Sequence, residues 1–305
     1  PHGPSPKAIE ALMNSASDFH RYPDSSGFYL RNKLAKKFNL QVNNVVIGAG
    51  SEGIMSTIMR NFLLNDDELI SAKDSFIGFR VLANSSGRKI NWVPMKQHRY
   101  DLDRMATKIT DYTKIIYIAN PDNPMGTYIT KKEFDDFYSH VPERVLIILD
   151  EAYFEFAEDI ADYPDSMTYR YDNVITLRSF SKAYGLGGIR IGYGFAHEDL
   201  ITNLIKVKVP FEPSMLAQIA GNAAIDDEEF LAQTITLNKE GKPHNPLINA
   251  GAIMTTSLIQ KEKTHSQRYE HIINIWKELS GGIGEVGFNN SVFLSEKNTA
   301  DRNFA

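Results

Sequence analysis

Residues 174–190 read VITLRSFSKAYGLGGIR, and the architecture of the chain can be worked out from how this stretch begins and ends. It opens with a β-prone apolar run from Val174 to Leu177, then passes directly into two hydroxyls, a lysine, a glycine-rich turn and an arginine. Reactive and anion-binding side chains seldom gather at the end of a strand for packing alone. The pattern therefore indicates chemistry at the end of a buried strand.

The residue types in this stretch predict an anchor for a cofactor. The amine of Lys182 can form an imine with an aldehyde, and Ser179, Ser181 and Arg190 supply donors that could hold a phosphate beside it. Pyridoxal phosphate (PLP) is a cofactor that carries both an aldehyde and a phosphate. The alternative is that Lys182 is a solvated lysine in a loop that needs glycine, and this stretch alone does not decide between the two.

The composition narrows the class of protein. The chain has 305 residues, of which 42% are hydrophobic and 23% charged, as in an ordinary globular protein of about two domains. A net charge of -5 without a long basic cluster argues against a nucleic-acid partner. No apolar run is long enough to span a membrane, and the lack of cysteine removes disulfides and cysteine zinc sites. We expect a cytoplasmic protein with no nucleic-acid, membrane or metal partner.

Residues 45–177 alternate short apolar runs with stretches of helical spacing. Strands are expected at residues 45–47, 68–72, 89–93, 114–119, 145–149 and 174–177, with helices between most of them, including one near 102–109. Continuous apolar strands that alternate with helices predict a mainly parallel sheet covered on both faces. The predicted fold class is therefore α/β, in a three-layer sandwich.

The turn at residues 48–53, GAGSEG, is a second candidate for binding phosphate. It links a strand to a helix, so free backbone N–H groups and the positive end of the helix dipole would face an anion. Its third glycine is misplaced for a dinucleotide pattern and no P-loop lysine follows, which favours an isolated phosphate over NAD or ATP. The alternative is a plain strand-to-helix turn capped by Ser51.

Three polar groups follow the predicted strands, at residues 120–124, 150–153 and 179–182. In parallel sheets, ligands bind past the carboxyl ends of the strands. The three groups therefore predict a single pocket at one edge of the sheet. Each group alone could equally be a turn former or a helix cap.

Together these motifs resemble the fold-type I PLP-dependent aminotransferases, most closely the histidinol-phosphate aminotransferase branch. The resemblance covers residues 1 to about 240. It rests, in family order, on Gly3–Pro6, His20–Asp24, Gly48–Glu52, Asn120–Gly126, Asp150–Tyr153 and Ser179–Arg190. Met125 departs from the pattern, since the family usually has threonine there. The abrupt proline-rich opening predicts that the amino end is truncated.

The resemblance implies a role for individual residues around the cofactor ring. Lys182 would bind the cofactor covalently and later move a proton at the substrate Cα. Asp150 would pair with the ring nitrogen, whereas Asn123 and Tyr153 would hydrogen-bond the ring hydroxyl. Phe76 would stack on the ring face. Packing in the core is the alternative for Phe76.

The resemblance also implies how the phosphate would be held. The predicted phosphate-binding set is Ser179, Ser181, Arg190 and the backbone of Ser51 and Glu52. Tyr22 would reach the phosphate of a neighbouring subunit, so the active unit would be a homodimer. Core packing is again the alternative for Tyr22.

From about residue 238 the chain resembles another family, the serine-dependent glutaminases, through residues 238–253 and 287–305. This resemblance implies that Asn249, Glu296 and Asn303 bind glutamine. The nucleophile of that family, a serine three residues before a lysine, is not in this segment. We expect two domains: an aminotransferase large domain at residues 1–240, and a chimeric or fused glutaminase-like fragment at 241–305 in place of the small domain.

The activity implied by the longer resemblance is PLP-dependent transfer of an amino group between an amino acid and a keto acid. The most similar reaction is that of histidinol-phosphate:2-oxoglutarate aminotransferase in histidine biosynthesis. Two alternatives remain open. The chain could act as a glutaminase-like amidohydrolase, although it lacks the nucleophile, or it could bind PLP without turnover, because the small domain that grips the substrate carboxylate is missing.

Overall fold

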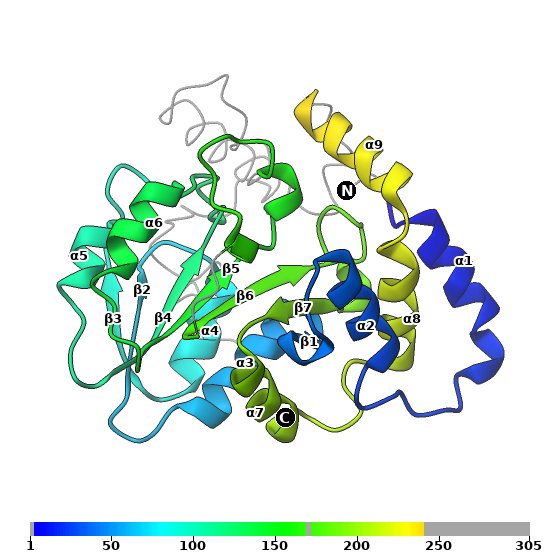
Figure 1. The fold of residues 1–305 in the computed structure, drawn as a ribbon, viewed down its shortest axis with the longest axis horizontal. Helices are drawn as coiled ribbons and strands as arrows, with labels where there is room; N and C mark the ends of the chain where they lie inside the picture. The colour runs from blue at the N-terminus through cyan, green and yellow to red at the C-terminus, as the bar shows by residue number, and fades with distance from the viewer. Residues whose placement is uncertain (1–2, 169–171, 241–305) are drawn as a thin grey trace, which may run out of the picture. The chain divides into compact units, whose positions relative to one another are not determined.

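The computed structural model describes residues 3–168 and 172–240 (Figure 1). The chain divides into two compact units, Pro1–Ile259 and Gln260–Ala305, and every described residue belongs to the first. The predicted glutamine-binding residues Asn249, Glu296 and Asn303 lie outside the described residues. The predicted fragment at 241–305 also lies outside them as a whole.

A seven-stranded sheet in the order β1-β7-β6-β5-β4-β2-β3 forms the middle layer of the described part. Its strands are β1 (Val45–Gly48), β2 (Glu68–Ala72), β3 (Lys89–Val93), β4 (Thr113–Ala119), β5 (Leu146–Asp150), β6 (Val174–Ser179) and β7 (Gly192–Phe195). Strands β3, β2, β4, β5 and β6 run parallel, whereas β7 pairs antiparallel with both β1 and β6. The predicted α/β class with a mainly parallel sheet is confirmed.

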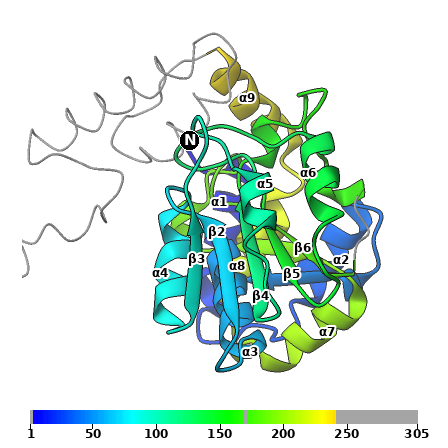
Figure 2. The same cartoon turned by 90° about the vertical axis from the view of Figure 1, so that its left-hand side faces the viewer.

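Helices cover both faces of this sheet (Figures 1 and 2). They are α1 (Pro6–Asn14), α2 (Phe28–Lys37), α3 (Gly50–Phe62), α4 (Ile77–Ser85), α5 (Leu102–Ala106), α6 (Lys131–Tyr138), α7 (Glu198–Val207), α8 (Met215–Ala224) and α9 (Glu228–Lys239). Helices α3, α4 and α7 pack on one face. On the other face, α5 and α6 pack beside β2, β4 and β5, and α1, α2 and α8 pack beside β1 and β7.

Strand β4 explains why the strands read as continuous apolar runs. Ile115 and Tyr117 join the core under α3 and α4, whereas Ile116 and Ile118 join the core under α5 and α6. All four side chains are fully buried. Because successive side chains point to opposite faces and both faces are covered, every position along the strand favours an apolar residue.

Local signals fix several helix ends. Helix α6 starts with a capping box, in which Thr130 Oγ1 accepts the Glu133 N–H and the Glu133 carboxylate accepts the Thr130 N–H. Helix α5 ends at Ala106, earlier than the predicted stretch to residue 109. The chain leaves it through tight turns, since the N–H groups of Lys108 and Ile109 donate three residues back.

The strand directions bring several loops to one edge of the sheet. Because β7 is antiparallel to both of its neighbours, β1 points the same way as β6 and the other parallel strands. The loops after β1, β2, β4, β5 and β6 therefore meet at the carboxyl edge, as expected for a ligand site.

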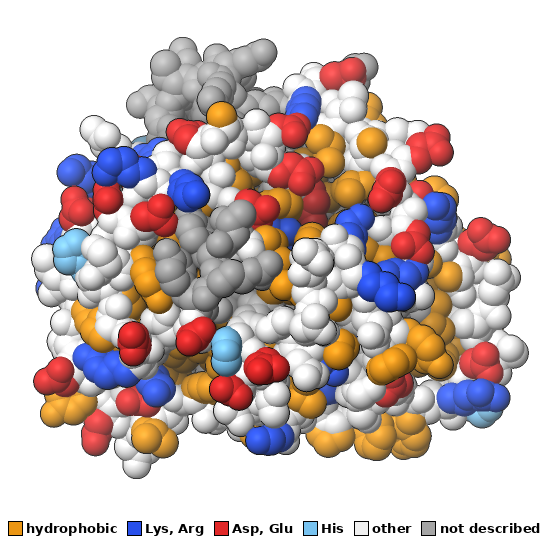
Figure 3. Space-filling view, viewed as in Figure 1, with side chains coloured by type: hydrophobic (Ala, Val, Ile, Leu, Met, Phe, Trp, Pro, Cys, Tyr) orange, Lys and Arg blue, Asp and Glu red, His pale blue; other side chains and the backbone are white. Residues whose placement is uncertain are grey.

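On the face shown in Figure 3, acidic and basic side chains are interspersed. In the part of the chain that the structure describes, no helix combines the length and the apolar character needed to cross a bilayer.

Candidate functional site

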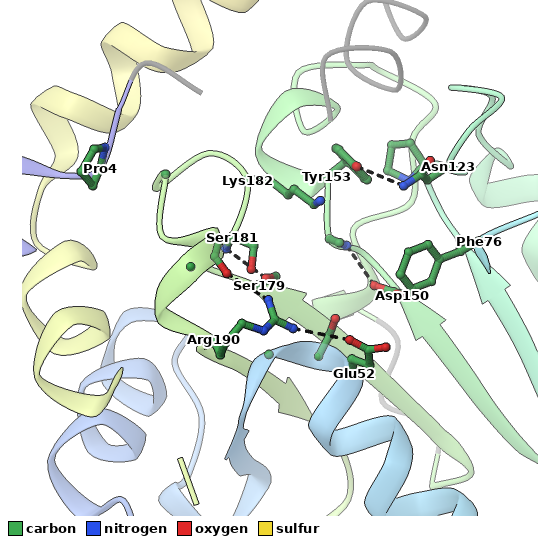
Figure 4. Close-up of a pocket in the computed structure, with 18 of the residues that line it drawn as sticks. Pro4, Glu52, Phe76, Asn123, Asp150, Tyr153, Ser179, Ser181, Lys182 and Arg190 are labelled. Atoms are coloured by element: carbon green, nitrogen blue, oxygen red, sulfur yellow. Dashed lines mark hydrogen bonds and ion pairs between the residues drawn. The ribbon is translucent and has the colours of Figure 1, made fainter. Parts of the chain in front are cut away.

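A cavity of about 510 Å³ opens at the carboxyl edge of the sheet (Figure 4). The residues from the sequence analysis that line it are Ser51, Glu52, Phe76, Asn123, Asp150, Tyr153, Ser179, Ser181, Lys182 and Arg190. They come from the carboxyl ends of β5 and β6, from the loops after β2, β4, β5 and β6, from the first turn of α3, and from Arg190, two residues before β7. The structure thus brings together, in one space, side chains that lie more than a hundred positions apart in the sequence.

Asp150 is the last residue of β5 and is 4% exposed. The Tyr117 hydroxyl donates to its Oδ2 at 2.9 Å, and the Ala152 N–H donates to its Oδ1 at 3.2 Å. Burial raises the pKa of Asp150 to about 6, although these two hydrogen bonds and the charge of Lys182 act to lower it. A cationic N–H group of a ligand would find here a buried carboxylate without a salt bridge among the described residues.

Lys182 leaves the loop after β6 and points into the same cavity (Figure 4). Its Nζ lies 5.1 Å from the centre of the Tyr153 ring. Tyr153 is itself buried, and its hydroxyl accepts a hydrogen bond of 3.3 Å from Asn123 Nδ2. An amine, a phenol and an amide therefore border one part of the cavity.

The first turn of α3 forms the anion-binding end of the cavity. Helix α3 begins at Gly50, and its N-cap residue Ala49 makes no side-chain cap, so Ser51 is not the cap that the simpler interpretation required. Uncapped N–H groups at a helix start favour an anion. Gly192 of β7 lies directly against this turn, because a Cβ there would be 2.4 Å from the Ser51 nitrogen. Only glycine permits so close a contact.

The hydroxyls of Ser179 and Ser181 and the guanidinium of Arg190 complete the anion-binding end of the cavity. Ser179 Oγ accepts the Ser181 N–H at 3.0 Å, so the two serines form one compact turn. Arg190 Nη2 lies 3.5 Å from Glu52 Oε2, and Arg190 Nη1 donates to the Gly187 carbonyl at 3.1 Å. The guanidinium is half exposed, so a phosphate can still reach it.

A model of the aminotransferase class I and II family matches residues 1–242. Over 242 residues the chain is 39% identical to histidinol-phosphate aminotransferase 2 of Carboxydothermus hydrogenoformans, covering 79% of this chain and 67% of that protein. The chain belongs to the aminotransferase class I and II family. It is also 40% identical over 243 residues to histidinol-phosphate aminotransferase 2 of Hydrogenovibrio crunogenus, covering 79% of this chain and 65% of that protein.

A solved relative extends the comparison to the fold. The crystal structure of histidinol-phosphate aminotransferase from Sinorhizobium meliloti in complex with pyridoxal-5'-phosphate matches this aminotransferase with a TM-score of 0.74 at 30% identity, covering 78% of this chain and 65% of that one. These matches confirm the predicted family and fold class, and the bound molecule in that relative supports the predicted cofactor. The chain spans about two thirds of the length of these relatives.

A second family model, that of the glutaminases, matches residues 220–305. It overlaps the aminotransferase match at residues 220–242, which include α9, the last described helix. The match agrees with the predicted resemblance of the carboxyl-terminal part. The domain boundary at residue 240 stays a prediction.

The residues present in this aminotransferase fit PLP. Lys182 offers an amine for the aldehyde, and Asp150 offers a buried acceptor for the ring nitrogen. At the other end, the uncapped turn of α3, the two serines and Arg190 offer donors for a phosphate. The assigned roles of these residues remain predictions, because only their positions are given by the structure.

Tyr22 is the one predicted cofactor residue that does not line the cavity. Its side chain is 79% exposed, and its ring centre lies 4.6 Å from that of Phe211, which is also exposed. The alternative of core packing is therefore wrong for Tyr22. Its predicted contact with a neighbouring subunit remains a prediction.

Tyr117 is a site residue that the sequence analysis missed. It lines the cavity, donates to Asp150, and stacks on Phe79 at 4.0 Å between ring centres. A signal for it exists in the sequence, since a tyrosine inside the aliphatic run of β4 must find a partner for its hydroxyl when it is buried. Its partner comes from the next strand in the sheet and cannot be read from the run itself.

Proposed function

We propose that the chain is a PLP-dependent aminotransferase domain that moves an amino group between an amino acid and a keto acid. The finer proposal is the reaction of histidinol-phosphate aminotransferase in histidine biosynthesis, because the relatives described above are histidinol-phosphate aminotransferases. One observation carries the proposal: Lys182, Asp150 and a phosphate-type donor set line a single cavity. A cytoplasmic location is part of the proposal and rests on composition alone.

When bound, PLP supplies an aldehyde and an electron-withdrawing ring. Lys182 Nζ would hold the cofactor and then take up and return the proton of the substrate Cα. The Asp150 carboxylate would hold the charge of the ring nitrogen, and burial would strengthen that interaction. Asn123 and Tyr153 would orient the ring through its hydroxyl, and Phe76 would cover one ring face and exclude water from it.

The direct test is absorbance of the purified full chain after PLP is added. The wild type should develop the absorbance band of a lysine-bound cofactor, and Lys182→Ala should lose it. Lys206→Ala is the matched control, because Lys206 lies on α7, outside the residues that line the cavity. An unchanged band in Lys182→Ala would overturn the assignment of the anchor.

Two other functions are favoured by specific observations. The aminotransferase match covers residues 1–242 and the glutaminase match covers residues 220–305, which favours a PLP-binding chain without turnover. A band that persists unchanged after addition of glutamate or histidinol phosphate would support that alternative. The glutaminase match favours an amidohydrolase. Ammonia release from glutamine that survives Lys182→Ala would support it, whereas Asn249→Ala should leave the PLP band intact if our proposal holds.

A further inference from the structure

Behind the wall of the cavity, hydrogen bonds connect side chains that are far apart in the sequence. The Ala119 N–H donates to the Tyr100 hydroxyl at 2.9 Å, and the Tyr100 and Ser75 hydroxyls are 2.6 Å apart. Ser75 Oγ donates to Asp122 Oδ1 at 2.5 Å. Burial raises the pKa of Asp122 to about 7, and when Asp122 is ionised Ser75 donates its proton to the carboxylate, so that the Tyr100 hydroxyl can donate to Ser75. In that state the chain of bonds has one direction and ends on Asp122.

Asp122 is completely buried and is held from two sides. Its Oδ2 accepts the Met125 N–H at 3.1 Å, and its own N–H donates to the Thr127 carbonyl at 2.8 Å. Both carboxylate oxygens thus act as acceptors, and an amide could not copy this. The Asp122 side chain therefore stabilises the loop after β4 through its bond with Met125, and links that loop to Ser75 in the loop after β2.

The residues that follow Ser75 and Asp122 in the sequence both line the cavity. Phe76 follows Ser75 in the loop after β2, and Asn123 follows Asp122 in the loop after β4. Strands β2 and β4 are adjacent in the sheet. Figure 4 shows the Phe76 ring and the Asn123 amide facing the same space. The Ser75–Asp122 bond therefore joins the two loops one residue away from the groups that they present to the cavity.

We propose that Asp122, acting through Ser75, is a positioning residue that fixes Phe76 and Asn123 relative to each other and so sets how the cofactor ring is held. This inference rests on the proposed function, because it needs a ring in the cavity. It does not make Asp122 or Ser75 a contact of the cofactor, since neither side chain lines the cavity.

The test compares PLP binding by the full chain with and without this bond. Ser75→Ala removes the donor, and Asp122→Asn removes one acceptor while keeping the shape. Each variant should bind PLP about tenfold more weakly, as expected when one buried hydrogen bond that orders the site is lost. The pH midpoint of the absorbance band should also move, because Asn123 and Tyr153 would no longer be held beside the ring hydroxyl. A merely structural bond would leave that midpoint where it is.

A matched pair of tyrosines provides the control. Tyr100→Phe removes a hydroxyl from the Asp122 chain, and Tyr138→Phe removes one that donates to Asn173 Oδ1 at 2.6 Å, beside the amino end of β6. Both should lower resistance to denaturant, but only Tyr100→Phe should change PLP affinity and the midpoint. Wild-type affinity and midpoint in folded Ser75→Ala would overturn the inference alone. A wild-type chain that forms no band would overturn the proposed function as well.

Discussion

Asp150 shows how a single residue is prepared for its proposed role. Burial raises its pKa to about 6, and the hydrogen bonds from Tyr117 and Ala152 partly offset that rise. The carboxylate is therefore mainly ionised at pH 7.5 and becomes neutral as the pH falls through about 6. Only the ionised form can balance a cationic ring nitrogen.

We therefore expect Asp150→Asn to weaken PLP binding strongly at pH 7.5 and only slightly at pH 5. Affinity of the wild type should fall by up to about tenfold per pH unit below its pKa through this group. Titration of both proteins with PLP at several pH values measures the ratio of the two dissociation constants, so effects shared by both proteins cancel. A ratio that stays constant between pH 5 and 7.5 would contradict the assignment of Asp150.

Glu155 gives a residue-scale prediction outside the cavity. It is 6% exposed, its Oε2 has no hydrogen-bond partner among the described residues, and burial raises its pKa from 4.5 to about 7. Because the folded-state pKa is raised, the folded state holds a proton that the unfolded state loses. Its contribution to stability is thus present below about pH 4.5 and is lost as the pH rises through about 7.

Glu155→Gln should accordingly be more stable than the wild type at pH 8, by about 3 kcal/mol at most, and should show little advantage at pH 4.5. Denaturant unfolding of the cofactor-free proteins at the two pH values measures this difference. An advantage of equal size at both values would mean that the ionisation of Glu155 is not its cause.

At the scale of elements, the phosphate end depends on the close approach of β7 to α3. A Cβ at Gly192 would lie 2.4 Å from the Ser51 nitrogen and 2.6 Å from the Gly50 carbonyl carbon. At Gly188, four residues earlier in the chain, a Cβ would meet nothing within 4 Å. Gly192→Ala must therefore move the first turn of α3, whereas Gly188→Ala need move nothing.

We expect Gly192→Ala to weaken binding of PLP more than binding of pyridoxal, which lacks the phosphate, and to cost about 1–3 kcal/mol of stability from overpacking. Gly188→Ala should keep the stability of the wild type, because its added methyl group meets no protein atom within 4 Å. Parallel titrations with the two ligands separate the phosphate from the rest of the cofactor. Equal losses for PLP and pyridoxal would show that the turn of α3 does not bind the phosphate.

The same scale shows what the sequence could and could not predict. Strands β2 and β3 have the predicted bounds, β4 differs by one residue at its start, and β5 is shifted by one residue at both ends, because apolar runs between polar turns mark buried strands well. Strand β7 was not predicted. Its sequence, GYGF, is half glycine, which weakens the strand signal of Tyr193 and Phe195, and its pairing with β1 joins residues about 150 positions apart. Gly192 is explained by the contact with α3, and Gly194 by the close approach of Leu177 and Val46 in the two neighbouring strands.

The site residues, like the strands, divide into those that local sequence could predict and those that depend on distant partners. Lys182, Asp150 and Asn123 were predictable because each follows a strand and carries chemistry that a turn does not need. Tyr117, Ser75 and the bond to Asp122 were not, because each depends on a partner from another loop or strand. Sequence periodicity places residues on an element, but only the packed sheet decides which neighbouring loops touch.

For the whole molecule, exposed aromatic rings support the proposed homodimer. Tyr22 and Phe211 are 79% and 51% exposed and lie against each other. If a second subunit covers them, Tyr22→Ala should shift the protein toward the monomer and weaken PLP binding. Light scattering coupled to gel filtration measures the oligomeric state, and titration with PLP measures the affinity. A monomeric wild type that binds PLP as tightly as Tyr22→Ala would contradict the proposed role of Tyr22.

The most direct measurement of the central claim is to reduce the full chain with borohydride in the presence of PLP, digest it, and locate the modified residue by mass spectrometry. We expect a stable adduct on the peptide that contains Lys182, and its loss in Lys182→Ala. A folded protein that gives no adduct, or one whose adduct lies on another lysine, would contradict that claim.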